Sequence, residues 1–144
     1  MGATLAWGNR YLMVEPDHFR VDYTINPFMH LDDQPDPVAA RAESHAIQAA
    51  IEAAGGTVER LAQRADAPDM VYAMNLGLAL DDRVVLSHMR YAERRMETPT
   101  AAGWFEDHGF APSYVGRDGV GAHLEAGDAF AWRGELVVGY GPRT

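Results

Sequence analysis

The fold is decided by residues 70–89, which read MVYAMNLGLALDDRVVLSHM. An apolar run from Met70 to Leu80 is followed by the turn Asp81-Asp82 and then by a second run from Arg83 to Met89. Two apolar runs joined by a short polar turn predict a β-hairpin. The length of the first run predicts that its strand is largely buried.

The residues after this hairpin predict a helix and one more strand. Thr98 and Pro99 are typical of a helix start, and Gly109 is typical of a helix end. A strand through Ser113-Tyr114-Val115 follows. The predicted order is therefore strand, strand, helix, strand.

The same pattern begins again later in the sequence. Ala129–Trp132, the turn Arg133-Gly134 and Glu135–Tyr140 predict a second hairpin. The sequence stops at Thr144, where the first unit continued into a helix. A hairpin without a covering layer leaves an apolar face exposed, so we expect part of a larger fold that associates or is unstable when isolated.

The N-terminal part of the sequence predicts a strand, a helix and a second strand. Tyr11–Val14 is a short apolar strand, and an irregular segment separates it from the helix. Asp36 is a candidate N-cap with Pro37 at the first helical position, and Gly55-Gly56 ends the helix. Thr57–Leu61 alternates as a strand does.

The composition is that of one globular domain. A chain of 144 residues buries roughly 68–70% of its unfolded surface on folding. Its content of 47% hydrophobic and 23% charged residues is ordinary for such a domain. No apolar run approaches the roughly 18 residues that span a bilayer. The first seven residues lack the parts of a secretory signal, so we expect a cytoplasmic protein.

The charged and metal-binding residues exclude several classes of function. A net charge of −9 argues against nucleic acid or an anionic membrane as a partner, because both require a basic face. All 12 basic residues are arginines, which either favours carboxylate recognition or reflects a compositional bias. Without cysteine these residues hold no disulfide, thiolate metal site or cysteine nucleophile. The histidines lack metal-ligand spacing, so we predict no metal site and no cofactor.

Residues 124–128, which read LEAGD, place a carboxylate on a bend just before the second hairpin. Glu125 is that carboxylate, and Arg143 lies at the far end of the hairpin. A site for an arginine-like molecule needs both signs of charge, one for the guanidinium and one for the carboxylate of the ligand. The pairing predicts an arginine-like small molecule as the partner.

Five segments carry a resemblance to a known family. They are Tyr23–Met29, Pro68–Asn75, the cluster from Arg90 to Arg95, Leu124–Asp128 and Gly139–Thr144. In this order they resemble the N-terminal half of the guanidino-group-modifying superfamily, which has the pentein or amidinotransferase fold. Its members include dimethylarginine dimethylaminohydrolase, arginine deiminase, arginine dihydrolase and glycine amidinotransferase.

The resemblance implies an α/β fold built of ββαβ modules in an α/β propeller. Residues 1–144 would form a partial pentein domain of roughly two and a half modules, about half of the full fold. The implied activity is hydrolysis of a guanidino C–N bond in arginine or a methylated arginine. The family's cysteine nucleophile and its histidine belong to the second half, so the partner expected is a second-half chain or another copy of this chain.

Glu125 matches the carboxylate at the centre of the family's site. A carboxylate can hold a planar guanidinium by paired hydrogen bonds and so orient its carbon for attack. The alternative is a polar residue that merely starts a strand. Asp128 on the same loop is expected to bond backbone amides, and Ala126 stands where the family usually has glycine.

Three further residues match positions that contact the substrate. Asp69 matches a substrate-binding aspartate, or else it caps the entry to a strand. Asn75 stands where dimethylarginine hydrolases and deiminases carry an aspartate, and with Asn26 it is more similar to the arginine dihydrolases. An asparagine within a buried strand requires hydrogen-bond partners, which are either a ligand or a neighbouring strand or loop.

Arg94 and Arg143 match arginines that bind the α-carboxylate of the substrate. The alternative for each is a solvated arginine on a loop. Two other functions remain open. One is a truncated module that binds guanidino compounds without catalysis, which the absence of cysteine favours. The other is an amidinotransferase, which shares the first chemical steps and differs in its acceptor.

Overall fold

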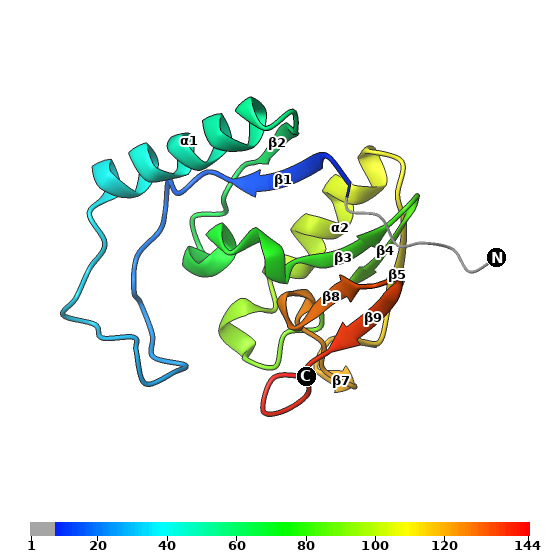
Figure 1. The fold of residues 1–144 in the computed structure, drawn as a ribbon. Coiled ribbons are helices and arrows are strands. Elements are labelled where there is room, and N and C mark those ends of the chain that lie inside the picture. Colours follow the sequence, from blue (N-terminus) through cyan, green and yellow to red (C-terminus); the bar gives the residue numbers. More distant parts are fainter. Residues whose placement is uncertain (1–7) are drawn as a thin grey trace. The chain divides into compact units, whose positions relative to one another are not determined.

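Residues 8–144 are described by a computed structural model and divide into two units (Figure 1). One unit consists of residues 9–73, and the other contains residues 74–144. The expectation about a secretory signal concerns residues outside the described part. Among the described residues, no helix has both the length and the apolar character needed to cross a membrane.

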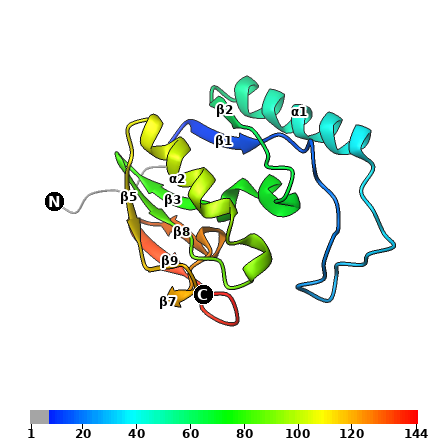
Figure 2. The ribbon, with the colours of Figure 1, turned by 180° about the vertical axis from the view of Figure 1, so that it is seen from behind.

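The unit of residues 9–73 is a strand–helix–strand crossover. Strand β1 (Arg10–Val14) pairs in parallel with β2 (Thr57–Leu61), with Arg10 opposite Thr57 and Val14 opposite Leu61. Helix α1 (Pro37–Ala53) connects them and lies along the strand pair (Figure 1, Figure 2). The predicted order of strand, helix and strand is confirmed here.

The ends of α1 follow from residues that the sequence singles out. The Asp36 side chain accepts hydrogen bonds from the backbone N–H groups of Val38 (2.8 Å) and Ala39 (3.3 Å), which have no partner within the helix. Pro37 occupies the first turn, where its missing N–H costs nothing. Beyond the helix, Gly55 adopts φ = 88°, a conformation that favours glycine.

The prediction of one long strand from Met70 to Leu80 is wrong for its first part. Two 3-10 turns take its place, η1 (Pro68–Val71) and η2 (Ala73–Asn75). The backbone bonds of η1 are local: Met70 N–H donates to Ala67 (3.1 Å) and Tyr72 N–H donates to Asp69 (3.0 Å). These turns satisfy the backbone without a partner strand, so apolar content alone was misleading.

The unit of residues 74–144 contains the predicted strand–strand–helix–strand module. Strands β3 (Gly77–Leu80), β4 (Arg83–Leu86) and β5 (Ala111–Tyr114) form one sheet in that order. The β3–β4 pair is antiparallel and the β4–β5 pair is parallel, with helix α2 (Glu97–Asp107) as the crossover. Buried apolar side chains form its core: Leu76, Val84, Leu86, Met89, Ala101, Ala102 and Phe105.

The second predicted hairpin is confirmed, and it is far more exposed than the first. Strands β8 (Ala129–Trp132) and β9 (Glu135–Val138) pair through a turn in which Arg133 (φ = 51°) and Gly134 (φ = 84°) both have positive φ. Such turns match the right-handed twist of paired strands. All four residues of β9 are exposed, as expected for a hairpin without a covering layer.

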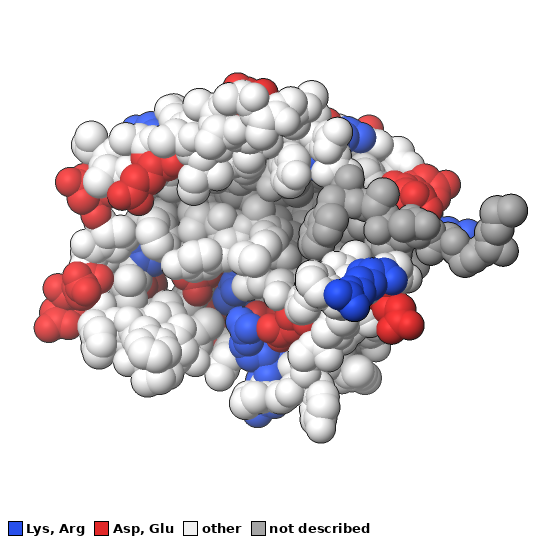
Figure 3. All heavy atoms as spheres, in the orientation of Figure 1, with Lys and Arg blue, Asp and Glu red and all other residues white. Residues whose placement is uncertain are grey.

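A smaller hairpin precedes it. Strands β6 (Gly116–Arg117) and β7 (Val120–Gly121) are joined by Asp118 and Gly119, which both have positive φ. On the face shown in Figure 3, arginines stand beside carboxylates and uncharged atoms make up most of the surface.

Candidate functional site

Glu125 is held on both sides by residues that follow β4. Its neighbour Leu124 makes two backbone hydrogen bonds with His88, of 2.9 and 3.3 Å. On the other side, the backbone N–H of Ala126 donates to the buried Ser87 hydroxyl at 2.9 Å. Turn η4 (Ala126–Asp128) then leads into β8. The Glu125 backbone is therefore fixed by the covered sheet.

The Glu125 carboxylate is buried between two guanidinium groups. The residue is 1% exposed, and its Oε2 lies 3.2 Å from Arg143 Nη1 and 4.0 Å from Arg94 Nη1. Burial raises the pKa of Glu125 above its ordinary value, because desolvation disfavours the charged form, and the charges of Arg143 and Arg94 oppose this shift. The site combines a desolvated carboxylate with cations that keep the charged form accessible.

Arg94 is buried and paired, so the alternative of a solvated arginine is wrong for it. It ends the turn η3 (Ala92–Arg94), and its Nε and Nη2 each donate to the carboxylate of Glu97 at 2.8 Å. Arg94 is 4% exposed and Glu97 is fully buried at the start of α2. This two-point pair leaves Nη1 facing Glu125. Binding of a substrate carboxylate by Arg94 stays a prediction.

Arg143 contacts two carboxylates of the same loop. Its Nη1 donates to Glu125 Oε2 (3.2 Å) and its Nη2 donates to Asp128 Oδ1 (2.5 Å). The other oxygen of Asp128 accepts from the Thr144 hydroxyl at 2.7 Å. Asp128 thus holds two side chains, whereas the sequence predicted bonds to backbone amides. About half of the Arg143 side chain, 47%, is exposed.

Asn75 is buried, and its side chain has no hydrogen-bond partner among the described residues. It is 8% exposed and ends the turn η2. Its Oδ1 lies so close to Gly127 that a Cβ at position 127 would be 2.1 Å away. The glycine therefore admits the Asn75 amide to the loop that carries Glu125. The two predicted partners of this amide, a ligand or a neighbouring strand or loop, stay predictions.

Two other predicted residues, Asp69 and Asn26, lie in the unit of residues 9–73. Asp69 is 4% exposed and belongs to η1, so it does not cap a strand entry. Asn26 is exposed, and its Oδ1 accepts from the backbone N–H of Phe28 at 2.9 Å, which stabilises a local turn. Their roles in substrate binding stay predictions.

Sequence reasoning missed three residues of the site, Ser87, His88 and Glu97. Glu97 follows Arg94 by three positions, a spacing that brings side chains together on a helical turn and was a usable signal. The His88 ring is buried, with Nδ1 2.8 Å from the carbonyl of Ala122 and Nε2 accepting from the backbone N–H of Gly119 at 3.1 Å. In the sequence, nothing distinguishes Ser87 and His88 from other residues at the end of a strand.

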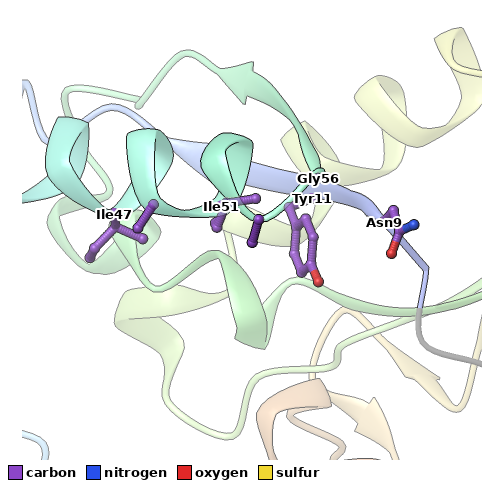
Figure 4. A pocket seen from close by; sticks show the side chains of 7 residues that line it. Asn9, Tyr11, Ile47, Ile51 and Gly56 are labelled. Atoms are coloured by element: carbon purple, nitrogen blue, oxygen red, sulfur yellow. The ribbon is translucent and has the colours of Figure 1, made fainter.

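Two cavities are lined by described residues other than Glu125, and the second reaches the site residues Ser87 and His88. One, of about 370 Å³, is mostly apolar and lies beside α1, with Tyr11, Ile47 and Ile51 in its wall (Figure 4). The other, of about 290 Å³, is bordered by the opening turn of α2 and by Arg117. Neither brings an unpaired buried polar side chain to its wall. Within residues 8–144, no group of three metal-ligating side chains comes together.

A comparison with known proteins finds several relatives of this chain. No family model matches the chain. The bifunctional arginine dihydrolase/ornithine cyclodeaminase ArgZ of Synechocystis is 39% identical over 142 residues, which is 94% of this chain and 19% of ArgZ. The dimethylarginine dimethylaminohydrolase of Mycobacterium tuberculosis is 31% identical over 137 residues, which is 94% of this chain and 43% of that enzyme. An uncharacterised protein of Caenorhabditis elegans is 38% identical, and the chain covers 47% of it.

A comparison with solved structures finds one of the same relatives. The N-terminal domain of ArgZ, solved as a cysteine-to-serine variant bound to its substrate, superposes with a TM-score of 0.83 at 34% identity. The match covers 94% of this chain and 50% of that domain. The chain therefore spans about half of the relatives' fold or less. Its named relatives and its structural neighbours are guanidino-group-modifying enzymes of pentein fold, and the match covers the N-terminal half of that fold.

Proposed function

We propose that this chain binds the guanidino group of arginine or a methylated arginine and forms the carboxylate-bearing half of a guanidino C–N hydrolase. One observation carries the proposal. The buried carboxylate of Glu125 already accepts a hydrogen bond from a guanidinium, that of Arg143, at 3.2 Å. A group of this shape and charge is therefore compatible with the site.

In this proposal Glu125 orients the ligand and Asn75 completes the contact. The carboxylate binds the guanidinium edge and fixes its plane, which exposes the central carbon to a nucleophile. The Asn75 amide offers an acceptor and two donors without adding charge. A thiolate from outside residues 1–144 would attack that carbon, form a covalent amidino-thioether and release an amine, and water would then cleave the C–S bond.

The arginine dihydrolase type is the substrate class that we favour. ArgZ carries that name and is 39% identical to this chain. The uncharged Asn75 supports the same choice by its resemblance to the dihydrolase branch. A module that binds guanidino compounds without turnover is the second candidate, favoured by the absence of cysteine from the 144 residues. An amidinotransferase would share the Glu125 contact.

Calorimetry on the chain and its Glu125→Gln variant tests the proposal. We expect arginine, agmatine or dimethylarginine to bind the chain, and the variant to bind at least about tenfold more weakly, because a charge-assisted contact is lost. Glu135→Gln is the matched control, since Glu135 is exposed on β9. Equal binding by Glu125→Gln and the unchanged chain would refute the role of Glu125.

Product analysis separates the candidate activities. The chain is incubated with each substrate, alone and with a second-half polypeptide that supplies the cysteine. Ornithine and ammonia without free citrulline would identify a dihydrolase, citrulline with dimethylamine a dimethylargininase, and binding without products a module. We expect no turnover by the 144 residues alone.

A further inference from the structure

We propose that the cavity beside α2 is a second ligand site, which takes a basic amino acid of the lysine type. This site goes beyond the proposed function, because it makes no use of Glu125. Its wall consists of residues between positions 87 and 118, all in the unit of residues 74–144 and away from both ends of the chain. The cavity measures about 290 Å³. Pockets for small ligands start at roughly 300 Å³, so a single amino acid suits it.

One face of α2 forms a wall of the cavity along most of the helix. The lining residues come from three successive turns: Thr98, Pro99, Ala102, Gly103 and Glu106. They are spaced three or four positions apart and therefore share one side of the helix. From Thr98 to Glu106 the helix rises by roughly 12 Å, at about 1.5 Å per residue. An elongated ligand therefore fits this wall better than a compact one.

Gly103 keeps the middle of this wall open. A Cβ at position 103 would meet no heavy atom within 4 Å, so the packing does not require glycine there. Glycine within a helix destabilises it relative to alanine. Pro99 and Ala102 flank the open position and present apolar atoms to it. The middle of the cavity therefore suits the aliphatic stem of a ligand.

Two guanidinium groups mark one end of the cavity. Arg95, two residues before α2, donates to two carbonyls of the preceding loop through Nε and Nη2. Its Nη1 makes no hydrogen bond among the described residues and would lie 3.0 Å from a Cβ at Gly119. The β6–β7 turn, with Arg117 over the Tyr114 ring at 4.3 Å, is therefore at the same end. Two guanidiniums without a carboxylate partner favour a ligand that carries a carboxylate.

Two carboxylates in the wall have no paired cation in the described part of the chain. Asp118 follows Arg117 in the β6–β7 turn, with φ = 54°, and so lies at the arginine end. It would bind the α-ammonium group beside the ligand's carboxylate. Glu106 lies toward the other end of α2 and would bind a cation at the tip of the ligand's side chain. A basic amino acid carries these three charges on one aliphatic stem.

Hydrogen bonds within the wall hold the cavity in shape. The Thr98 hydroxyl donates to the carbonyl of Ser87 at 2.9 Å, which fixes the first turn of α2 to the end of β4. The His88 ring accepts from the backbone N–H of Gly119 at 3.1 Å and lies 2.8 Å from the carbonyl of Ala122. These contacts fix the β6–β7 hairpin. A ligand therefore meets a preformed site and loses little affinity to reorganisation.

The experiment is an NMR titration of the 144-residue chain, labelled with ¹⁵N, with lysine at low salt. Lysine has the three charges but no guanidino group, so it separates this cavity from the Glu125 site. We expect the amide signals of Gly103 and Gly119 to shift. The signal of Gly127, in the Glu125 loop, should not. Butylamine lacks the carboxylate and norleucine lacks the side-chain cation, so each should bind about fivefold more weakly, the loss expected for one exposed ion pair.

Two variants test the α2 wall. Gly103→Leu fills the open middle and should abolish lysine binding, while the midpoint of urea unfolding should not fall, because leucine is the better helix former. Glu106→Gln should weaken lysine binding about fivefold and leave norleucine binding unchanged. Asp107→Asn is the matched control, since it neutralises the next exposed carboxylate of α2, which does not line the cavity. It should bind lysine as the unchanged chain does.

Four results would overturn the inference. Lysine binding that survives in a folded Gly103→Leu chain places the ligand elsewhere. Equal affinities for lysine and norleucine refute the assigned class of ligand. Shifts confined to Gly127 and its neighbours assign lysine to the Glu125 site. If lysine shifts no signal, the second site fails, and the binding of guanidino compounds at Glu125 is tested separately by agmatine.

Discussion

Two short segments each bring one arginine to Glu125, and they do so in contrasting ways. The turn η3 before α2 presents Arg94, which is buried and bound at two points to Glu97. The segment of residues 139–144 presents Arg143, whose side chain is about half exposed and is shared between Glu125 and Asp128. One carboxylate therefore faces a fixed cation and an accessible one.

The difference indicates how a buried carboxylate can stay both charged and available. Arg94 lies 4.0 Å from Glu125 and makes its two-point contact with Glu97. It therefore supplies positive charge near Glu125 without occupying the Glu125 carboxylate. Arg143 does occupy it, from the solvent side. A fixed cation lowers the cost of charging a desolvated carboxylate, and an exposed one leaves room for exchange.

The largest expected effect comes from removing the fixed arginine. Arg94→Ala removes the cation that binds the buried Glu97 at two points, and breaking a buried pair in this way lowers the free energy of unfolding by about 3–5 kcal/mol. Arg143→Ala removes a partly exposed contact and should cost about 1 kcal/mol or less. Urea unfolding of the two variants, followed by circular dichroism, measures the difference.

A double variant controls for this comparison. Replacing Arg94 and Glu97 together by leucine removes both buried charges, so its loss of stability should be smaller than that of Arg94→Ala. Equal losses of unfolding free energy in Arg94→Ala and Arg143→Ala would contradict the contrast between a fixed and an accessible arginine.

A smaller effect is expected from Ser87→Ala, which loosens the loop that both arginines face. Its hydroxyl accepts from the backbone N–H of Ala126, and leaving that buried donor unpaired costs about 1–3 kcal/mol. Agmatine binding should weaken with it, because Glu125 is no longer fixed from that side. Ser113→Ala on β5, an exposed position, is the control. Unchanged stability and binding in Ser87→Ala would contradict a positioning role.

The smallest effect is a dependence of stability on pH. The pKa of Glu125 is raised in the folded chain above its ordinary value of 4.5, mainly by desolvation. A raised pKa means that its contribution to stability is full below the unfolded value and is lost as pH rises through the folded value. The stability of Glu125→Gln relative to the unchanged chain should therefore increase with pH across that window.

Urea unfolding of both chains at a series of pH values tests this sign. Binding gives a second readout, because a protonated Glu125 offers no charge to a guanidinium. Agmatine affinity should fall as pH drops through the raised pKa of Glu125. A stability difference that shrinks with rising pH would contradict the desolvation of Glu125.

Local signals predicted much of the fold. Asp36 and Gly55 mark the ends of α1 because a cap and a positive φ depend on single residues. The Arg133-Gly134 turn was readable for the same reason. The segment of residues 70–75 was mispredicted, because it forms 3-10 turns that bury Met70 and leave Met74 exposed, and composition alone does not separate turns from a strand.

The sequence predicted the carboxylate of the candidate site better than it predicted the residues that contact this carboxylate. Glu125 and Arg143 were expected to bind opposite ends of one ligand, and the structure pairs them with each other. Arg94 was predicted to bind the substrate's carboxylate, with a solvated arginine as the alternative, and its pairing with Glu97 was not foreseen. Ser87 carried no signal at all, since its contact with Ala126 spans 39 positions of sequence.

The His88 ring has one further consequence for chemistry at this site. Because Nδ1 faces the carbonyl of Ala122 and Nε2 accepts from the backbone N–H of Gly119, both ring nitrogens are already engaged in local contacts. A new hydrogen bond from Nε2 would require breaking the Gly119 contact that closes the small hairpin. Any proton transfer that the proposed hydrolase needs beside Glu125 would then fall to a residue other than His88.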